Sequence, residues 1–149
     1  MERVRKEIFI EAPVSKVFEY MLDPAHLPEI WPSLVEVSNV HTSPDGRSDY
    51  DWTYKMAGVK FHGHTQTVEA QRDRLHVVKA RGGIPHAIRW TFQPHGDGTD
   101  FSTEVEYEIP GSLLGRLTAP FLRRLNEREA ELTVHNLKER METPTPGTA

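Results

Sequence analysis

Histidine, tyrosine and arginine are the residues of this sequence with the greatest capacity for chemistry, and the first candidate is a histidine pair. His62 and His64 are separated by one residue, so on a strand they share one face and could offer two imidazoles to a metal ion. A third ligand would have to come from a neighbouring strand. Because solvent-facing polar positions are the simpler interpretation, the sequence predicts no metal site.

A second group of side chains could move protons or bind a polar ligand. Arg128 could contact the polar end of a ligand. Tyr54 and Tyr107 could donate the matching hydrogen bonds, and His86 could act as an acid or a base. Structural roles without chemistry remain open for both residues. His86 could lie at the protein surface or at the opening of a cavity, and Arg128 could pair with a carboxylate of the sheet. The sequence therefore predicts no defined catalytic set.

Several kinds of catalysis are excluded by what the sequence lacks. It contains no cysteine, which excludes thiolate nucleophiles, disulfides and Cys-ligated metal centres. GxSxG, P-loop, GxGxxG and HExxH patterns are also absent. We therefore expect no nucleotide, metal or other cofactor.

The composition is that of a single globular domain. The chain has 149 residues, 37% of them hydrophobic, and 18 Lys and Arg against 22 Asp and Glu give a net charge of −4. This balance does not favour a nucleic-acid partner. No run of about 18 apolar residues could cross a membrane, and residues 1–7 lack the apolar core of a signal peptide. We expect a cytoplasmic monomer or homodimer without integral membrane association.

The hydrophobic pattern predicts the elements that position these side chains. Residues 3–11 suit an edge-type strand, and the spacing over residues 14–22 predicts a short amphipathic helix. Three prolines within residues 24–32 allow at most one further helical turn. Over residues 34–109 the period changes to two, and short turns predict six strands in an antiparallel meander.

The turn at Ala57-Gly58 decides which side chains face inward, because a shift of one residue exchanges the two faces of a strand. A two-residue turn places Met56 opposite Val59. Phe61 then points inward, while His62 and His64 point outward. The turn at residues 71–74 leaves the orientation of His76 open.

One long helix is predicted at the end of the domain. Helical spacing covers residues 111–142 and is interrupted at Pro120, which should kink the helix or begin a new one. Its predicted inward stripe contains Phe121, Leu125, Arg128 and Leu132. Residues 143–149 have nothing apolar to bury and are predicted to be a disordered tail, so the domain should span residues 1–142.

These elements predict an α+β fold with an internal cavity. A seven-stranded antiparallel sheet curves around one long C-terminal helix, and two short helices follow the first strand. Since a helix is only about 10 Å across, it cannot fill the concave side of such a sheet. The predicted ligand-binding residues are Trp52, Tyr54, Phe61, Trp90, Phe92, Tyr107, Phe121, Leu125 and Arg128.

Three segments resemble a known superfamily. Residues 10–20 (IEAPVSKVFEY) and 27–32 (LPEIWP) look like the N-terminal signature of START/Bet v 1-like (SRPBCC) proteins, in particular the polyketide cyclase/dehydrase and lipid-transport branch. Residues 126–138 resemble the terminal helix of the same branch. The resemblance implies a helix-grip fold that binds lipids, polyketides, quinones or similar small hydrophobic molecules, with no required metal or nucleotide.

Three functions remain open at this point. The leading hypothesis is binding of a small hydrophobic or aromatic ligand in the cavity. The second, which the resemblance implies, is a polyketide aromatase/cyclase or dehydratase in which Arg128 polarises a ketone and stabilises an enolate while Tyr54, Tyr107 or His86 carries the proton. Whether the protein is an enzyme therefore stays undecided. The third is a protein-interaction module without ligand, which predicts a filled core and an exposed apolar patch at residues 27–32.

Overall fold

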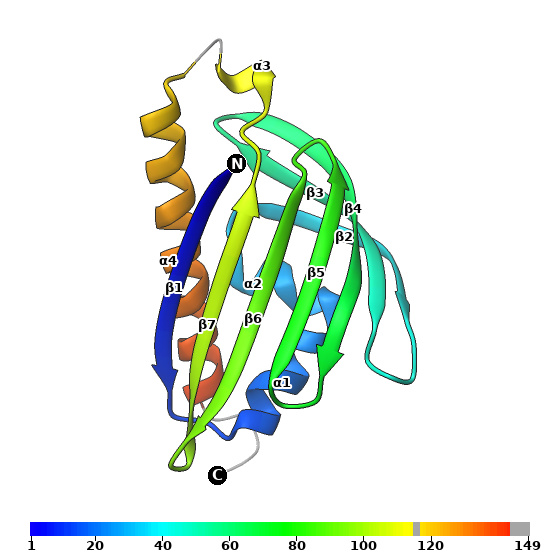
Figure 1. The fold of residues 1–149 in the computed structure, drawn as a ribbon, viewed down its shortest axis with the longest axis vertical. Helices are drawn as coiled ribbons and strands as arrows, with labels where there is room; N and C mark the ends of the chain where they lie inside the picture. Colours follow the sequence, from blue (N-terminus) through cyan, green and yellow to red (C-terminus); the bar gives the residue numbers. More distant parts are fainter. Residues whose placement is uncertain (115–116, 144–149) are drawn as a thin grey trace.

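The computed structural model describes residues 1–114 and 117–143 and contains a seven-stranded antiparallel sheet. The strands are β1 (Glu2–Ile10), β2 (Leu34–Thr42), β3 (Ser48–Met56), β4 (Val59–Gln71), β5 (Leu75–Gly82), β6 (His86–His95) and β7 (Gly98–Tyr107). Their order across the sheet is β1-β7-β6-β5-β4-β3-β2, with β1 and β2 at the two edges (Figure 1). The predicted meander, preceded by one edge strand, is confirmed.

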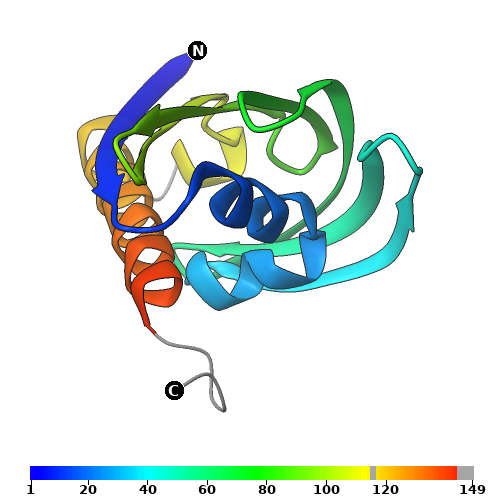
Figure 2. The same cartoon turned by 90° about the horizontal axis from the view of Figure 1, so that it is seen from below.

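The helices lie on the concave side of this sheet. They are α1 (Val14–Leu22), the 3-10 helix η1 (Pro24–His26), α2 (Leu27–Ile30), α3 (Gly111–Leu114) and α4 (Ala119–Glu142). In Figure 2 the sheet curves around α1 and α2, while α4 runs beside β1. Pro120 stands in the first turn of α4, where the missing N–H costs no helical hydrogen bond, so it begins this helix. Apart from Thr143, the predicted tail lies outside the described residues.

The β3–β4 hairpin has the predicted register. Ala57 and Gly58 both have positive φ angles, as in a type I′ turn, and Met56 pairs with Val59. Phe61 is therefore buried and His62 exposed. This register places the aromatic side chains of β3 on the concave side of the sheet.

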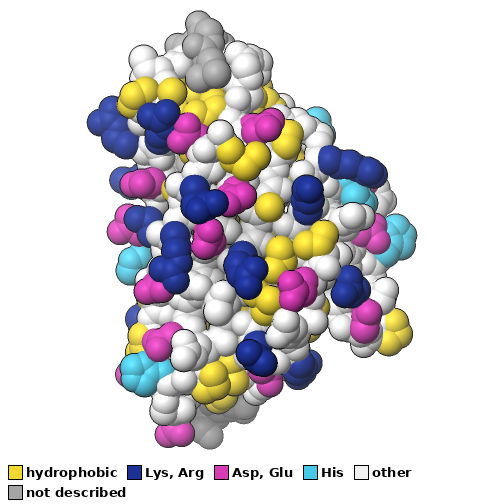
Figure 3. Space-filling model, in the orientation of Figure 1, with side chains coloured by type: hydrophobic (Ala, Val, Ile, Leu, Met, Phe, Trp, Pro, Cys, Tyr) yellow, Lys and Arg dark blue, Asp and Glu magenta, His cyan; other side chains and the backbone are white. Residues whose placement is uncertain are grey.

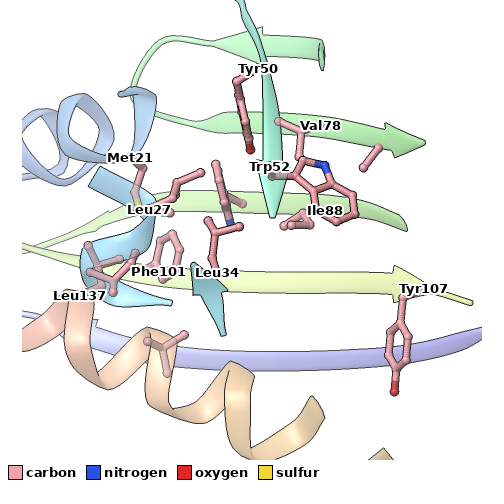
Figure 4. Close-up of a cluster of buried hydrophobic side chains, with 14 of the residues drawn as sticks. Met21, Leu27, Leu34, Tyr50, Trp52, Val78, Ile88, Phe101, Tyr107 and Leu137 are labelled. Atoms are coloured by element: carbon pink, nitrogen blue, oxygen red, sulfur yellow. The ribbon is translucent and has the colours of Figure 1, made fainter. Parts of the chain in front are cut away.

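The end of the sheet next to α1 is packed with protein side chains. The rings of Phe18 and Phe92 meet edge to face with centroids 5.0 Å apart, and Phe101 lies 5.4 Å from Phe92. Leu137 of α4 reaches the same cluster, whereas Tyr107 lies towards the other end of the sheet (Figure 4). The cluster fills this end of the concave side with protein atoms.

The buried face of α4 differs from the predicted stripe. Phe121 and Leu132 are 42% and 37% exposed, and Arg128 is exposed to solvent. The side chains that the helix buries are instead Leu122, Ala130, Val134, Leu137 and Met141. This second stripe contains no charged residue and runs to the last turn of the helix, so burying it avoids the cost of burying the Arg128 guanidinium.

The outer face of the sheet is polar. Figure 3 shows basic and acidic side chains interspersed over β1, β7, β6 and β5, and Arg3 of β1 pairs across the strands with Glu104 and Glu106. Among the described residues, no helix combines the length and apolar character needed to cross a bilayer. The apolar side of the sheet is therefore the concave one.

Candidate functional site

A cavity lies between the sheet, α2 and α4. Its volume is about 70 Å³, which is room for several water molecules. Most of its wall is apolar, and six aromatic side chains contribute to it: Trp31, Tyr50, Trp52, Tyr54, Trp90 and Tyr107. Figure 4 shows Tyr50 and Trp52 on β3 of the sheet and Leu27 on α2 of the helical layer. Both layers therefore contribute apolar wall to the cavity that the sequence predicted.

The structure separates the nine predicted ligand-binding residues into three groups. Lining the cavity are Trp52, Tyr54, Trp90 and Tyr107. Phe61 and Phe92 are buried in the core, and Leu125 is half-buried against it, but none of these three lines the cavity. Phe121 and Arg128 are on the exposed side of α4, so the expectation that both face the interior is wrong.

Glu129 stands where Arg128 was expected. Its half-buried side chain lines the cavity, together with Asn126, Ala130 and Thr133 of α4. One carboxylate oxygen, Oε1, accepts a hydrogen bond from the backbone N–H of Ser33. Within the described part of the chain, Glu129 is the one Asp, Glu, Lys or Arg that lines the cavity.

Tyr54 lies close enough to Glu129 to respond to its charge. Burial raises the pKa of the Tyr54 hydroxyl, and the Glu129 carboxylate raises this pKa further. The ring of Trp31 meets that of Tyr54 edge to face, with centroids 5.8 Å apart. An anionic oxygen and two aromatic rings therefore lie together at this part of the wall.

Tyr107 supplies a second hydroxyl on the wall. Burial raises its pKa, and the Asn126 side chain acts in the opposite direction. The phenol therefore keeps its proton at neutral pH. Tyr107 pairs with His86 on the neighbouring strand, which places these two groups side by side at one end of the cavity.

His86 is half-buried and lines the cavity beside Trp52, with ring centroids 5.5 Å apart. Its Nδ1 lies 2.7 Å from the carbonyl oxygen of Ile84. Since a carbonyl only accepts, Nδ1 carries the proton and Nε2 of the neutral ring is an acceptor. Burial lowers the pKa of His86 against a smaller opposing effect of this hydrogen bond, so the neutral form is favoured.

Trp52 occupies its place because a glycine faces it across the hairpin. Gly63 pairs with Trp52, and a Cβ atom at position 63 would stand 2.1 Å from Cζ2 of the indole. Glycine thus leaves the space in which the indole lies. The indole Nε1 is buried and has no hydrogen-bond partner among the described residues.

The other histidines considered from the sequence lie outside the cavity wall. His76 is buried in the core, beside Thr67 and Trp90. His64 is on the outer face, where its Nδ1 is 2.8 Å from Oδ1 of Asp51. In residues 1–114 and 117–143 no group of three or more His, Asp or Glu is arranged to hold a metal ion.

Residues 27–32 form part of the wall and not an exposed patch. Leu27 and Ile30 are buried, and Trp31 lines the cavity. Trp31, Tyr50, Asn126 and Glu129 were not among the predicted site residues. Tyr50 shares the strand alternation of Trp52 and Tyr54, so its position could have been found, whereas Trp31 depends on how the proline-rich connector folds.

Comparisons with known proteins agree with this architecture. A family model described as "Polyketide cyclase / dehydrase and lipid transport" matches residues 1–142. A search of curated protein sequences finds no match.

Among solved structures, protein TTHA0849 from Thermus thermophilus has a TM-score of 0.75 and 23% identity, with 94% of this chain and 97% of that one covered. A START superfamily protein from Mycobacterium smegmatis has a TM-score of 0.76 and 16% identity, with coverage of 94% and 97%. Zhui aromatase/cyclase from Streptomyces sp. R1128 has a TM-score of 0.73 and 15% identity, with coverage of 95% and 93%. At these identities the likeness shows a shared fold.

Proposed function

Since the chain belongs to the polyketide cyclase / dehydrase and lipid transport family, we propose that it binds a small hydrophobic or aromatic ligand in the cavity between the sheet and α4. The observation that carries this proposal is the wall of six aromatic side chains around space not filled by protein. Burial of apolar ligand surface at roughly 25 cal/mol per Å² would supply most of the affinity.

Binding requires the wall to move. The free volume of about 70 Å³ is well below the roughly 300–1,000 Å³ of typical small-molecule sites. The connector of residues 24–33 is the candidate for the moving part, because Leu27, Ile30 and Trp31 of this segment line the cavity. Two side chains of α4 hold its end in the closed position. Asn136 donates to the carbonyl of Ile30 at 2.9 Å, and Glu129 accepts from Ser33.

A binding experiment tests the proposal directly. Three tryptophans line the cavity, so intrinsic fluorescence should change on titration with two-ring aromatic compounds, quinones or short lipids. Native mass spectrometry of the purified protein should also reveal a bound small molecule. If no compound of such a panel changes the emission or the melting temperature, the cavity is not a binding site.

A second function, cyclisation or dehydration of a poly-ketone, is favoured by the neighbouring His86 and Tyr107. Nε2 of His86 would take a proton from the carbon next to a ketone, and the Tyr107 hydroxyl would donate a hydrogen bond to the resulting enolate oxygen. Incubation with a short poly-β-ketone thioester should then give ring products, and His86→Gln should abolish them. Product formation equal to that of a protein-free blank would contradict this function.

A further inference from the structure

Among the described residues, the one formally charged side chain of the cavity wall is the acidic Glu129. Oε1 of Glu129 is taken by the Ser33 N–H, whereas its other carboxylate oxygen has no donor within the described part of the chain. Nε2 of His86 is an acceptor because Nδ1 donates to Ile84. No Lys or Arg of the described residues lines the cavity.

The Glu129 charge should make the cavity discriminate between negatively and positively charged ligands. A carboxylate entering the cavity would meet the Glu129 charge without a guanidinium or ammonium to pair with it, and both the repulsion and the desolvation oppose binding. An ammonium group would meet the carboxylate as a charge-assisted hydrogen-bond acceptor. The neighbouring rings of Trp31 and Tyr54 present π-electrons that attract cations.

Trp52 adds one neutral hydrogen-bond donor to the cavity wall. Its side chain lines the cavity, is more than nine-tenths buried, and keeps Nε1 without a hydrogen-bond partner in the described residues. A buried, unpaired indole N–H is unfavourable unless a ligand or a water accepts from it, and because an ammonium group has no acceptor, a water must do so when an amine is bound. This donor is neutral, so it does not replace the missing cation.

We infer that the cavity selects aromatic ligands whose polar end is a protonated amine, accepts neutral hydroxyl compounds less well and rejects carboxylates, and that Glu129 decides this order. The inference rests on the proposed binding function and narrows its ligand class. Glu129 acts as the specificity-determining residue through its unpaired oxygen. Its other oxygen fixes the side chain by holding the backbone of Ser33.

Three ligands of nearly equal size test the order: 2-naphthylmethylamine, 2-naphthylmethanol and 2-naphthoate. Their dissociation constants are measured at pH 7 by calorimetry and by tryptophan fluorescence. The amine should bind at least about tenfold more tightly than the carboxylate, as expected for one charge-assisted contact. Equal affinity of the amine and the carboxylate would overturn the inference but leave the binding function standing, whereas no binding of any of the three would overturn both.

Two variants complete the test. Glu129→Gln keeps an acceptor for the Ser33 N–H but removes the charge, so amine affinity should fall by about tenfold and carboxylate affinity should rise. Glu131→Gln, on the exposed side of the same helix, removes one charge without touching the cavity and should leave the order unchanged. A similar effect of both variants would mean that net charge, and not Glu129, sets the preference.

Discussion

His76 shows how burial can fix the protonation state of one residue. The side chain is 2% exposed, its Nε2 lies 2.9 Å from Oγ1 of Thr67, and its ring packs edge-on against Trp90 with centroids 5.5 Å apart. Burial lowers its pKa from 6.5 to about 4. No described group is within hydrogen-bond distance of Nδ1, so the core does not stabilise the charged form.

His76 should therefore make the protein acid-sensitive. Between about pH 6.5 and pH 4 the unfolded chain binds a proton at this position that the folded chain does not, so stability falls as the pH is lowered, by up to about 1.4 kcal/mol per pH unit. His76→Gln should reduce the difference in urea-unfolding free energy between pH 7 and pH 5. His135→Gln, on the exposed side of α4, should not. An unchanged difference in the His76 variant would show that other groups cause the acid sensitivity.

Gly63 determines the position of the Trp52 indole, and this gives a second prediction for a single residue. In Gly63→Ala the new methyl would stand 2.1 Å from Trp52 and 2.5 Å from the carbonyl oxygen of Arg81. Overpacking of this kind costs about 1–3 kcal/mol, and tryptophan emission should shift as the indole moves. Gly111→Ala, where no atom lies within 4 Å of the added carbon, is the matched control and should change the unfolding free energy little. Equal stability of the two variants would contradict the packing described for Trp52.

Among the elements, α4 and the connector before β2 together close the cavity. Asn136 of α4 donates to the Ile30 carbonyl at the end of α2, and Arg140 pairs with Glu29 at 2.8 Å. The surface ion pair contributes little because solvent screens it. The hydrogen bond of Asn136 is part-buried, and loss of such a bond costs about 1 kcal/mol.

Asn136→Ala should accordingly loosen the connector. Stopped-flow fluorescence should show faster association of 2-naphthylmethanol than in the unmodified protein, while the melting temperature falls by a few degrees. His135→Ala changes the adjacent, exposed position and should leave both quantities as they are. If association is equally fast in all three proteins, the ligand enters by another route.

At the scale of the whole molecule, ligand binding and stability are linked. A ligand that binds only the folded state at 100 times its dissociation constant adds about 2.7 kcal/mol to the unfolding free energy. For a chain of this size that corresponds to a rise in melting temperature of roughly 5–10 °C. A compound that shows tight binding by calorimetry but raises the melting temperature by less than 1 °C at this excess would have to bind the unfolded chain almost as well as the folded one.

The alternation of residues 50–56 and the two-residue turn at Ala57-Gly58 were enough to predict the β3–β4 register, because a pleat with period two allows only two assignments. The same local rules predicted the antiparallel meander, and they predicted that Pro120 either kinks the last helix or begins a new one, of which the structure shows the second. Four of the predicted cavity residues, Trp52, Tyr54, Trp90 and Tyr107, followed from these strands. These features depend on residues that are close to one another in the sequence, so the sequence alone is enough to predict them.

The rotation of α4 and the size of the cavity depended on tertiary packing. The helix carries two apolar stripes, and only the competition between them for β1 and the core decides that Leu122 and Val134 are buried while Phe121 and Leu132 remain exposed. A rotation of one residue, about 100° around the helix axis, exchanges Arg128 for Glu129 at the cavity wall. The sequence therefore determined that a cavity has aromatic walls, and the three-dimensional packing decided the sign of its charge.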